Sequence, residues 1–253
     1  MTVPTSRGMT QRVAYTDRDL DFTWIQQIWT MSVFMLKRAI VSVIGRERAN
    51  RLSAPYHDWT ARRRTRRFLS VLPSTNLQVN LGCGWRPLPH WINLDVARGP
   101  NVDVVWDLRK GLPFAADSCT AVFSEHVIEH LSKEDGQSLV NEIYRVLMPG
   151  GVVRISTPDA GRYLRSYAGD GKFLSDPRFK QSVDTPLDRV NIMMREYGLH
   201  HWVYDSQSLQ LVLRRAGFVN VLEQSYGKSC HPSMQAIDSE DRAFESLYIE
   251  ATK

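Results

Sequence analysis

The residues best suited to chemistry in this sequence are histidines and carboxylates that lie close together. His126, Glu129 and His130 fall within five consecutive positions, and the pair His200 and His201 follows later in the chain. Histidine changes protonation state near neutral pH, which makes it the usual general base. On a helix, positions 126 and 130 share one face, and these residue types also bind divalent metals. The histidines therefore indicate either proton transfer or metal binding.

A second set of polar residues follows short apolar runs, where ligands bind in open α/β sheets. Asp95 has two carboxylate oxygens that can accept from both hydroxyls of a ribose. Gly82 and Gly84 let the backbone approach a ligand closely, but the sequence lacks the third glycine of a dinucleotide fingerprint and any phosphate-binding loop. A nucleoside ligand without a phosphate is therefore expected. The residues at these strand ends are Asn80, Gly82, Gly84, Asp95, Asp107, Glu125, His126 and Thr157 to Asp159.

Strands and helices must alternate after residue 74 to position these groups. Ser132 is expected to cap the start of one helix, which ends at Pro149 and the two glycines after it. Asp205 is expected to cap the start of another helix, which ends at Gly217. Seven strands with interleaved helices predict an α/β fold, a Rossmann-like doubly wound sheet that is mostly parallel, with an antiparallel C-terminal hairpin. The expected strands cover residues 77–81, 91–96, 103–106, 120–124, 152–156, 218–222 and 246–251.

Five motifs follow one another across residues 77–159. They are Val79–Gly84 (VNLGCG), Asn93–Asp95 (NLD), Asp107–Leu108 with Leu112–Phe114, Phe123–Leu131 (FSEHVIEHL) and Glu142–Gly151 (EIYRVLMPGG). In this order they resemble class I S-adenosylmethionine-dependent methyltransferases of the type 11-like group. The run Glu245–Glu250 (ESLYIE) further resembles a subgroup associated with cell-surface glycan and glycolipid synthesis.

The resemblance implies S-adenosylmethionine as cofactor and assigns roles to the motif residues. Gly82 and Gly84 would lie beneath its methionine part, and Asp95 would bind the ribose hydroxyls. The other implied contacts are Asn80 and Leu81 in the first motif, Asp107 and Leu108 beside the adenine, and Glu125 and His126 near the sulfonium.

Two departures from the family pattern stand out. Asn80 occupies a position that usually carries an acid. Only ten residues separate Gly84 from Asp95, too few for a crossover helix and a strand. The first helix is therefore expected to be a short turn that contains Pro87 and Pro89.

The run from His126 to His130 supports three interpretations. Its H-x-x-E-H spacing matches the inverted zinc-peptidase motif, but the methyltransferase motifs surround it. It is also similar to the run in metal-assisted O-methyltransferases, including small-RNA 2′-O-methyltransferases and ubiquinone-pathway enzymes; the metal ligands would then be His126, Glu129, His130 and His201. In the third interpretation Glu129 and His130 only fix the local structure. Because His126 replaces the first glutamate of the metal-binding run, a bound metal is not favoured.

Residues 160–204 form a long irregular region, which we expect to be the acceptor-site insertion or lid of a methyltransferase domain over 74–253. A hydroxyl acceptor must lose a proton, so the reaction requires a base. His201, near the end of this region, is the predicted general base. His126 and His200 are the other catalytic candidates.

Charge is concentrated before the predicted domain. Residues 1–73 carry +8 and residues 74–253 carry −3, and the densest basic cluster runs from Arg62 to Arg67. Apolar residues at helical spacing between Trp24 and Ile44 predict an amphipathic, basic helical segment over 1–73. It is either a solvated helix face or a surface for an anionic partner, such as a membrane or a phosphorylated substrate. Nucleic acid is not expected, because no nucleic-acid module accompanies the charge.

Composition limits the class of protein. With 43% apolar and 23% charged residues, the 253-residue chain is neither disordered nor collagen-like, and three widely spaced cysteines exclude a disulfide scaffold. The start resembles no signal peptide, and the longest uncharged stretch, Phe22–Leu36, is shorter than the roughly 20 residues of a membrane span. We expect a cytoplasmic protein, membrane-associated if the basic segment binds lipid. Nothing in the sequence indicates an oligomeric state.

The sequence therefore predicts a methyltransferase that modifies a hydroxyl of a sugar, glycolipid or related small metabolite. An N- or C-methyltransferase of a small molecule is the alternative within the class. A metal-dependent hydrolase and a non-catalytic S-adenosylmethionine-binding subunit are the alternatives outside it.

Overall fold

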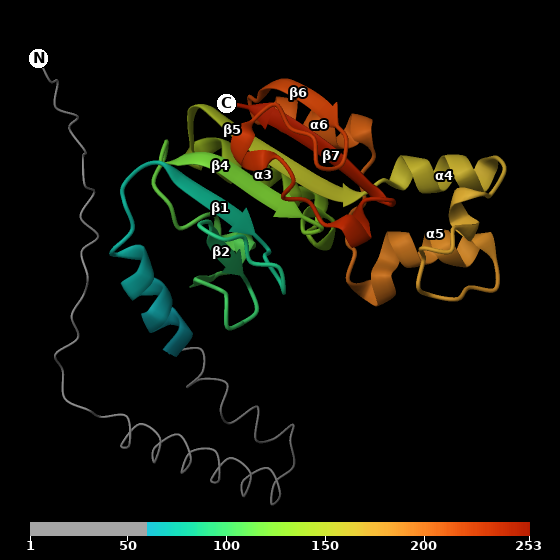
Figure 1. Cartoon of the computed structure of the whole chain (residues 1–253), viewed down its shortest axis with the longest axis horizontal. Coiled ribbons are helices and arrows are strands. Elements are labelled where there is room, and N and C mark those ends of the chain that lie inside the picture. Colours follow the sequence, from blue (N-terminus) through green and yellow to red (C-terminus); the bar gives the residue numbers. More distant parts are fainter. Residues whose placement is uncertain (1–59) are drawn as a thin grey trace, which may run out of the picture. The chain divides into compact units, whose positions relative to one another are not determined.

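A seven-stranded sheet is the centre of the computed structural model, which describes residues 60–253 (Figure 1). The strand order is β3-β2-β1-β4-β5-β7-β6. Strands β1 to β5 pair in parallel, and β7 runs antiparallel between β5 and β6. The predicted α/β fold with an antiparallel C-terminal hairpin is confirmed. The strands are β1 (Leu77–Leu81), β2 (Ile92–Asp95), β3 (Val104–Val105), β4 (Cys119–Glu125), β5 (Leu147–Pro158), β6 (Val219–Gln224) and β7 (Ser246–Thr252).

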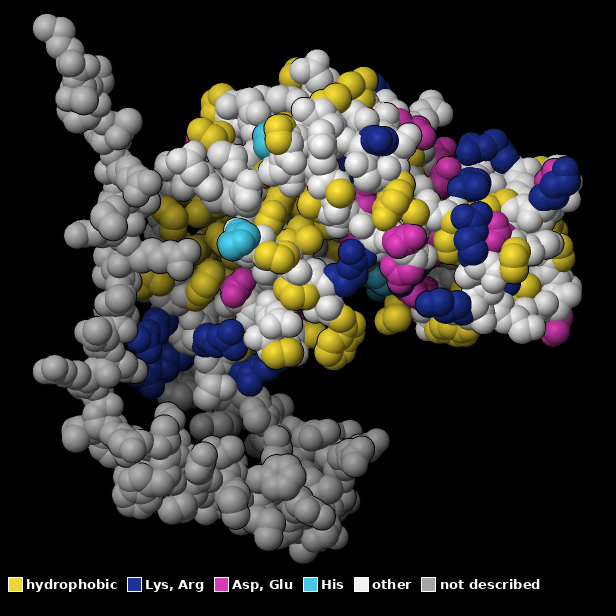
Figure 2. Space-filling model, in the orientation of Figure 1, with side chains coloured by type: hydrophobic (Ala, Val, Ile, Leu, Met, Phe, Trp, Pro, Cys, Tyr) yellow, Lys and Arg dark blue, Asp and Glu magenta, His cyan; other side chains and the backbone are white. Residues whose placement is uncertain are grey.

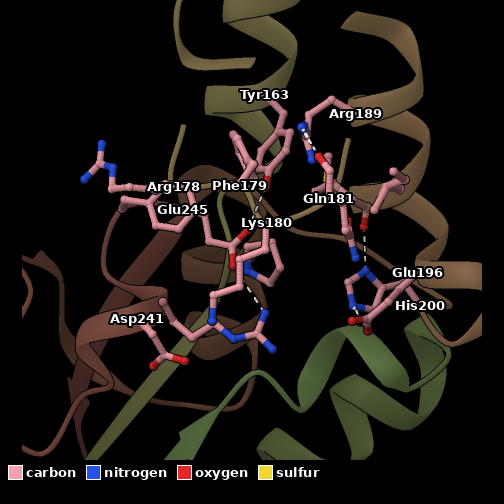
Figure 3. A pocket seen from close by; sticks show the side chains of 15 residues that line it. Tyr163, Arg178, Phe179, Lys180, Gln181, Arg189, Glu196, His200, Asp241 and Glu245 are labelled. Atoms are coloured by element: carbon pink, nitrogen blue, oxygen red, sulfur yellow. Dashed lines mark hydrogen bonds and ion pairs between the residues drawn. The ribbon is translucent and has the colours of Figure 1, made fainter. Parts of the chain in front are cut away.

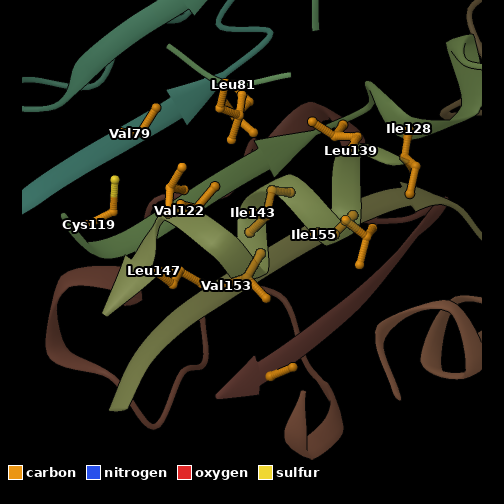
Figure 4. Close-up of a cluster of buried hydrophobic side chains, with 14 of the residues drawn as sticks. Val79, Leu81, Cys119, Val122, Ile128, Leu139, Ile143, Leu147, Val153 and Ile155 are labelled. Carbon is orange, nitrogen blue, oxygen red and sulfur yellow. The ribbon is translucent and has the colours of Figure 1, made fainter. Parts of the chain in front are cut away.

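The central strands are apolar because both faces of the sheet are covered. Val79, Val122 and Val153, on three neighbouring strands, are fully buried. Figure 4 shows these side chains close to Ile143 of helix α3 (Lys133–Val146). This packing fixes the positions of the strand ends.

Helices α3 and α6 (Ser206–Arg215) begin at the predicted caps. Ser132 Oγ accepts a hydrogen bond from Asp135 N at 3.1 Å, and Asp205 Oδ1 accepts from Ser208 N at 2.8 Å. Such caps satisfy backbone donors that the first helical turn leaves unpaired. Both helices bury their apolar face in the core.

The region 160–204 is more regular than its glycine and proline content suggests. It contains α4 (Ala160–Ala168), α5 (Pro186–Arg195) and two 3-10 turns, Phe173–Ser175 and Glu196–Gly198. Thr185 forms a capping box at the start of α5, and the glycine and proline content of the region does not reveal this helix start. These elements pack on a cluster separate from the main core, and Figure 1 shows α4 and α5 together beside the sheet.

A helix over residues 60–69 also packs against the main core, through Phe68 and Leu69. Among the described residues, this helix therefore belongs with the compact unit that contains the sheet. The predicted amphipathic stretch Trp24–Ile44 and the rest of 1–59 lie outside the described residues. Within 60–253, no helix has the length and apolar character needed to cross a bilayer.

The connection from β1 to β2 is a short turn, as the ten-residue spacing predicts. Two buried amides hold it. Asn80 Nδ2 donates to Asn93 Oδ1 at 3.0 Å and to the carbonyl of Arg86 at 3.3 Å. Asn93 Oδ1 also accepts from Leu88 N at 2.8 Å, and its Nδ2 donates to the carbonyls of Leu88 and Trp91. The two amides thus bind backbone groups that a helix would have paired internally.

Asn80→Asp tests this account. Aspartate resembles the family pattern, but its carboxylate would face the Asn93 and Arg86 oxygens without a proton to donate. We expect a loss of about 1–3 kcal/mol in the free energy of unfolding, measured by urea titration. Asn141→Asp is the control, because exposed Asn141 accepts its hydrogen bond from Gln137. Equal stability of Asn80→Asp and wild type would contradict the role of the amide pair.

Candidate active site

The turn after β1 borders open space. Gly82 and Gly84 have φ of 64° and 49°, which glycine adopts readily. A Cβ on Gly82 would lie 2.2 Å from a methyl of Val127, whereas a Cβ on Gly84 would meet no atom within 4 Å. Gly84 N donates to Asp95 Oδ2 at 2.9 Å, and Ala97 N donates to Asp95 Oδ1 at 2.7 Å. Packing therefore requires glycine at 82, while Gly84 leaves room for a ligand beside Asp95.

Asp95 has acceptor positions free for the hydroxyl groups of a ligand. A carboxylate has about four acceptor positions, and the two backbone donors use two of them. The side chain is half-buried at the end of β2, beside the open turn. The residues predicted to bind the ribose and methionine parts, Asp95, Gly82 and Gly84, thus lie together. Asn80 instead turns to Asn93, and Leu81 is buried in the core.

Asp107 and Leu108 follow β3, at the predicted adenine side. Arg109 donates to both carboxylate oxygens of Asp107, at 2.9 and 2.8 Å. These hydrogen bonds hold the pKa of Asp107 below its ordinary value. Leu108 is partly buried against the core and offers an apolar surface. An adenine amino group would share the Asp107 carboxylate with Arg109.

Glu125, at the end of β4, holds the loop that precedes β7. It accepts from the backbone N of Ser239 at 2.8 Å and from the Ser239 hydroxyl, and lies 3.5 Å from Arg86 Nη1. Buried Arg154 anchors the same loop through Asp238, at 2.6 Å. Glu125 therefore joins the two loops that flank this strand end.

His126 is fixed at both ring nitrogens. Its Nε2 lies 2.7 Å from Ser246 Oγ, and its Nδ1 lies 3.2 Å from Glu129 Oε1. The backbone of His126 is left-handed, with φ of 51°, which is uncommon for a non-glycine residue. The ring is therefore hydrogen-bonded at Nε2 and lies against a carboxylate at Nδ1.

Glu129 is fully buried, and its Oε2 accepts from Thr157 Oγ1 at 3.1 Å. Burial alone would raise the pKa of Glu129. The interaction with His126, together with smaller contributions that include His130, outweighs the effect of burial, so the pKa lies below its ordinary value. Glu129 is therefore an ionised partner of His126.

The two adjacent histidines of the acceptor region have different surroundings. His200 has a side chain only 6% exposed, with Nδ1 2.5 Å from the carbonyl of Met193 and Nε2 2.9 Å from Glu196 Oε2. His201 donates its backbone N–H to the carbonyl of Glu129 at 2.8 Å, and the residue is exposed. Among residues 60–253, no hydrogen bond engages the His201 ring. It is thus the candidate base whose nitrogens are open.

The predicted metal ligands do not assemble as expected. Glu129 and His130 lie near His200 rather than His201, with one potential ligand atom of each within 4.8 Å of the others. Glu129 already contacts His126 and Thr157, and both nitrogens of His200 have protein partners. As arranged, this group does not fit a metal, and the hydrogen bonds favour the interpretation in which Glu129 and His130 fix the local structure.

A pocket of about 240 Å³ lies among α4, α5 and the loop before β7 (Figure 3). His200 and Glu196 line it, as do Tyr163 and Phe244. The Tyr163 hydroxyl donates to Glu245 Oε2 at 2.8 Å, and burial raises the pKa of Tyr163. The predicted acceptor region thus provides a cavity next to a catalytic candidate.

Sequence reasoning misses Ser239 and Ser246, which bind Glu125 and His126. They lie 114 and 120 positions away from these partners, and although Ser246 falls in the run Glu245–Glu250, nothing in that run indicates a contact with His126. Arg109, two residues after Asp107, could have been found as a nearby cation. Arg189, in the pocket wall, has no sequence signal.

Comparison with known proteins matches residues 89–155 to the methyltransferase domain family. Similar solved structures include S-adenosylmethionine-dependent methyltransferases from three organisms. The Mesorhizobium loti protein is 18% identical in sequence with a TM-score of 0.42, and the match covers 74% of this chain and 95% of that one. The Archaeoglobus fulgidus protein is 18% identical with a TM-score of 0.44, covering 75% of this chain and 91% of that one. The Thermotoga maritima protein is 19% identical with a TM-score of 0.45, covering 81% of this chain and 97% of that one. No curated protein sequence matches significantly. The family match runs from the connection before β2 into β5, so this part of the chain is similar to methyltransferase domains.

Glu129→Gln tests the buried ion pair. We expect a loss of about 1.5–3 kcal/mol in the free energy of unfolding at pH 7, because a neutral amide replaces the partner of His126. Because the pKa of Glu129 is lower in the folded protein, its ionised form stabilises the fold fully at pH values above its ordinary pKa of 4.5. This contribution to the free energy of unfolding is lost as the pH falls through the folded-state pKa. The difference from wild type in urea unfolding should therefore shrink in acid. Exposed Glu134→Gln is the control, and equal effects of the two variants at pH 7 would contradict the account.

Proposed function

We propose that this chain uses S-adenosylmethionine to methylate a hydroxyl of a sugar, glycolipid or related small metabolite, with His201 as general base. The observation that carries the cofactor assignment is the hydrogen bond from Gly84 N to Asp95, which brings the open glycine turn and the ribose acceptor together. The family match across β2 to β5 supports it.

The proposed reaction asks two things of the protein. The bound cofactor would supply a methyl group already activated by its sulfonium, so the chain must align the acceptor and take its proton. As the acceptor oxygen forms the new C–O bond, the C–S bond breaks and its electron pair stays on sulfur. The hydroxyl proton passes to the imidazole of His201.

His201 is preferred over the other two catalytic candidates on contacts alone. The rings of His126 and His200 contact protein groups at both nitrogens, whereas the His201 ring makes no hydrogen bond within residues 60–253. The backbone of His201 is held on the carbonyl of Glu129, three residues after His126. His201 therefore belongs to a segment that is hydrogen-bonded to the residues following β4, which supports its proposed role.

The sugar or glycolipid acceptor is supported by the resemblance of Glu245–Glu250 to the glycan-associated subgroup. In this structure the segment forms the start of β7, and it supplies Ser246 to His126 and Glu245 to the pocket. The distinctive motif thus lies at the proposed acceptor site. An N- or C-methyltransferase would need less help from a base, and the second experiment below separates it from the proposal.

The first experiment is calorimetric titration of S-adenosylhomocysteine into chelator-treated protein. Wild type should bind in the micromolar range without added metal. Asp95→Ala should bind about 100-fold more weakly, because charge-assisted hydrogen bonds to the ribose are lost. Asp184→Ala, which removes an exposed acid before α5, should bind like wild type. Absence of wild-type binding, or wild-type affinity in Asp95→Ala, would reject the cofactor site.

The second experiment measures methyl transfer across a panel of hydroxylated sugars and glycolipids. On any compound that is methylated, His201→Ala should lower kcat by about 10²–10⁴-fold, the usual contribution of a general base. Its affinity for S-adenosylhomocysteine should not change, and His231→Ala should retain wild-type kcat. Full activity of His201→Ala would favour N- or C-methylation instead.

A further inference from the structure

Arg189, on α5, is a buried cation with unused donors. Arg189 is only 6% exposed. Its buried Nε and Nη1 atoms have no hydrogen-bond partner within residues 60–253. Only Nη2 is engaged, donating to the carbonyl of Gln181 at 2.7 Å, while the guanidinium lies 4.3 Å from the ring centre of Phe179. Arginine does not lose its charge in proteins, so burying it without an anion is costly.

Arg189 is one of the residues that line the pocket described above. Figure 3 shows Arg189 and Gln181 on its α5 side. Three acids also line this pocket, but the described residues place each of them against another group. Glu196 lies 2.9 Å from His200, Glu245 contacts Tyr163 and Arg242, and Asp241 lies 3.9 Å from Arg86.

The other cations that line the pocket differ in whether an acid pairs with them. Arg178 pairs with Asp176 at 2.6 Å, outside the pocket lining. Lys180 is exposed at the pocket, and no acid within residues 60–253 pairs with it. Figure 2 shows Lys and Arg side chains gathered over the α4 and α5 part of the surface. Within residues 60–253, neither Arg189 nor Lys180 forms an ion pair with an acid.

We infer that Arg189 binds an oxyanion carried by the methyl acceptor: a carboxylate, a phosphate or a sulfate. A neutral sugar would leave the buried guanidinium unpaired, whereas an acidic or phosphorylated sugar would supply the missing acceptor atoms. The aromatic side chains of Phe179 and Phe244 provide an apolar wall for the rest of the molecule. This inference rests on the proposed function, because it takes the pocket to be the acceptor site.

The experiment titrates three separate probes, inorganic phosphate, sulfate and acetate, into the full chain at constant ionic strength, with calorimetric detection. At least one probe should bind wild type saturably at one site. Arg189→Met should weaken that binding at least tenfold. Arg195→Met, which removes an exposed arginine from the same helix, should leave it unchanged. The probe that binds most tightly identifies the acidic group.

Stability supplies an independent readout. Without an anion, Arg189→Met should melt at or above the wild-type temperature, since methionine removes an unpaired buried charge and keeps the packing. Phosphate should raise the melting temperature of wild type more than that of the variant. If Arg189→Met does not fold, Lys180→Ala serves as the second variant and should weaken binding of the same probe several-fold.

Two results would overturn the inference: no saturable binding of any probe to wild type, or equal binding to wild type and Arg189→Met. S-adenosylhomocysteine is titrated into the same preparations. If it fails to bind while an anion binds through Arg189, the proposed function fails and the anion site stands. If it binds while no anion does, the methyltransferase proposal stands and the anionic acceptor is rejected.

Discussion

The carboxylate of Glu129 connects the parts of the molecule that must act together. Its two oxygens face His126, after β4, and Thr157, in β5. Through His126 the carboxylate reaches Ser246 at the start of β7. The backbone carbonyl of Glu129 accepts the backbone N–H groups of His201 and Trp202. Full burial strengthens these electrostatic contacts and makes an unpaired charge there costly. The arrangement of the acceptor side therefore depends on one residue, through its ionised side chain and its backbone carbonyl.

The cofactor side depends on a different pair of polar groups. The amides of Asn80 and Asn93 hold the short connection after the glycine turn, and that turn is hydrogen-bonded to Asp95. The two departures from the family pattern, the missing acid and the missing helix, thus have one explanation. An amide at position 80 donates to backbone and side-chain oxygens of a loop that has no helical hydrogen bonds of its own. Changing either feature alone would leave polar groups unpaired.

Much of this structure could be predicted from the sequence, because strand ends follow from local apolar runs and a parallel sheet brings those ends to one edge. Asp95, Gly82 and Gly84 lie together for that reason. The contacts of Glu125 and His126 with Ser239 and Ser246 depend on chain closure over more than a hundred residues. His200 rather than His201 lies beside His130, after a left-handed turn at Glu196 and Tyr197. Such conformations leave no periodic signal.

The central claim is that the glycine turn and Asp95 hold the adenosyl part of S-adenosylmethionine. A crystal structure of the chain with S-adenosylhomocysteine tests it most directly. The account predicts ribose hydroxyls within hydrogen-bonding distance of the Asp95 carboxylate and the methionine part over Gly82 and Gly84. A ligand bound elsewhere, or bound here with Asp95 making no contact to the ribose, would contradict it.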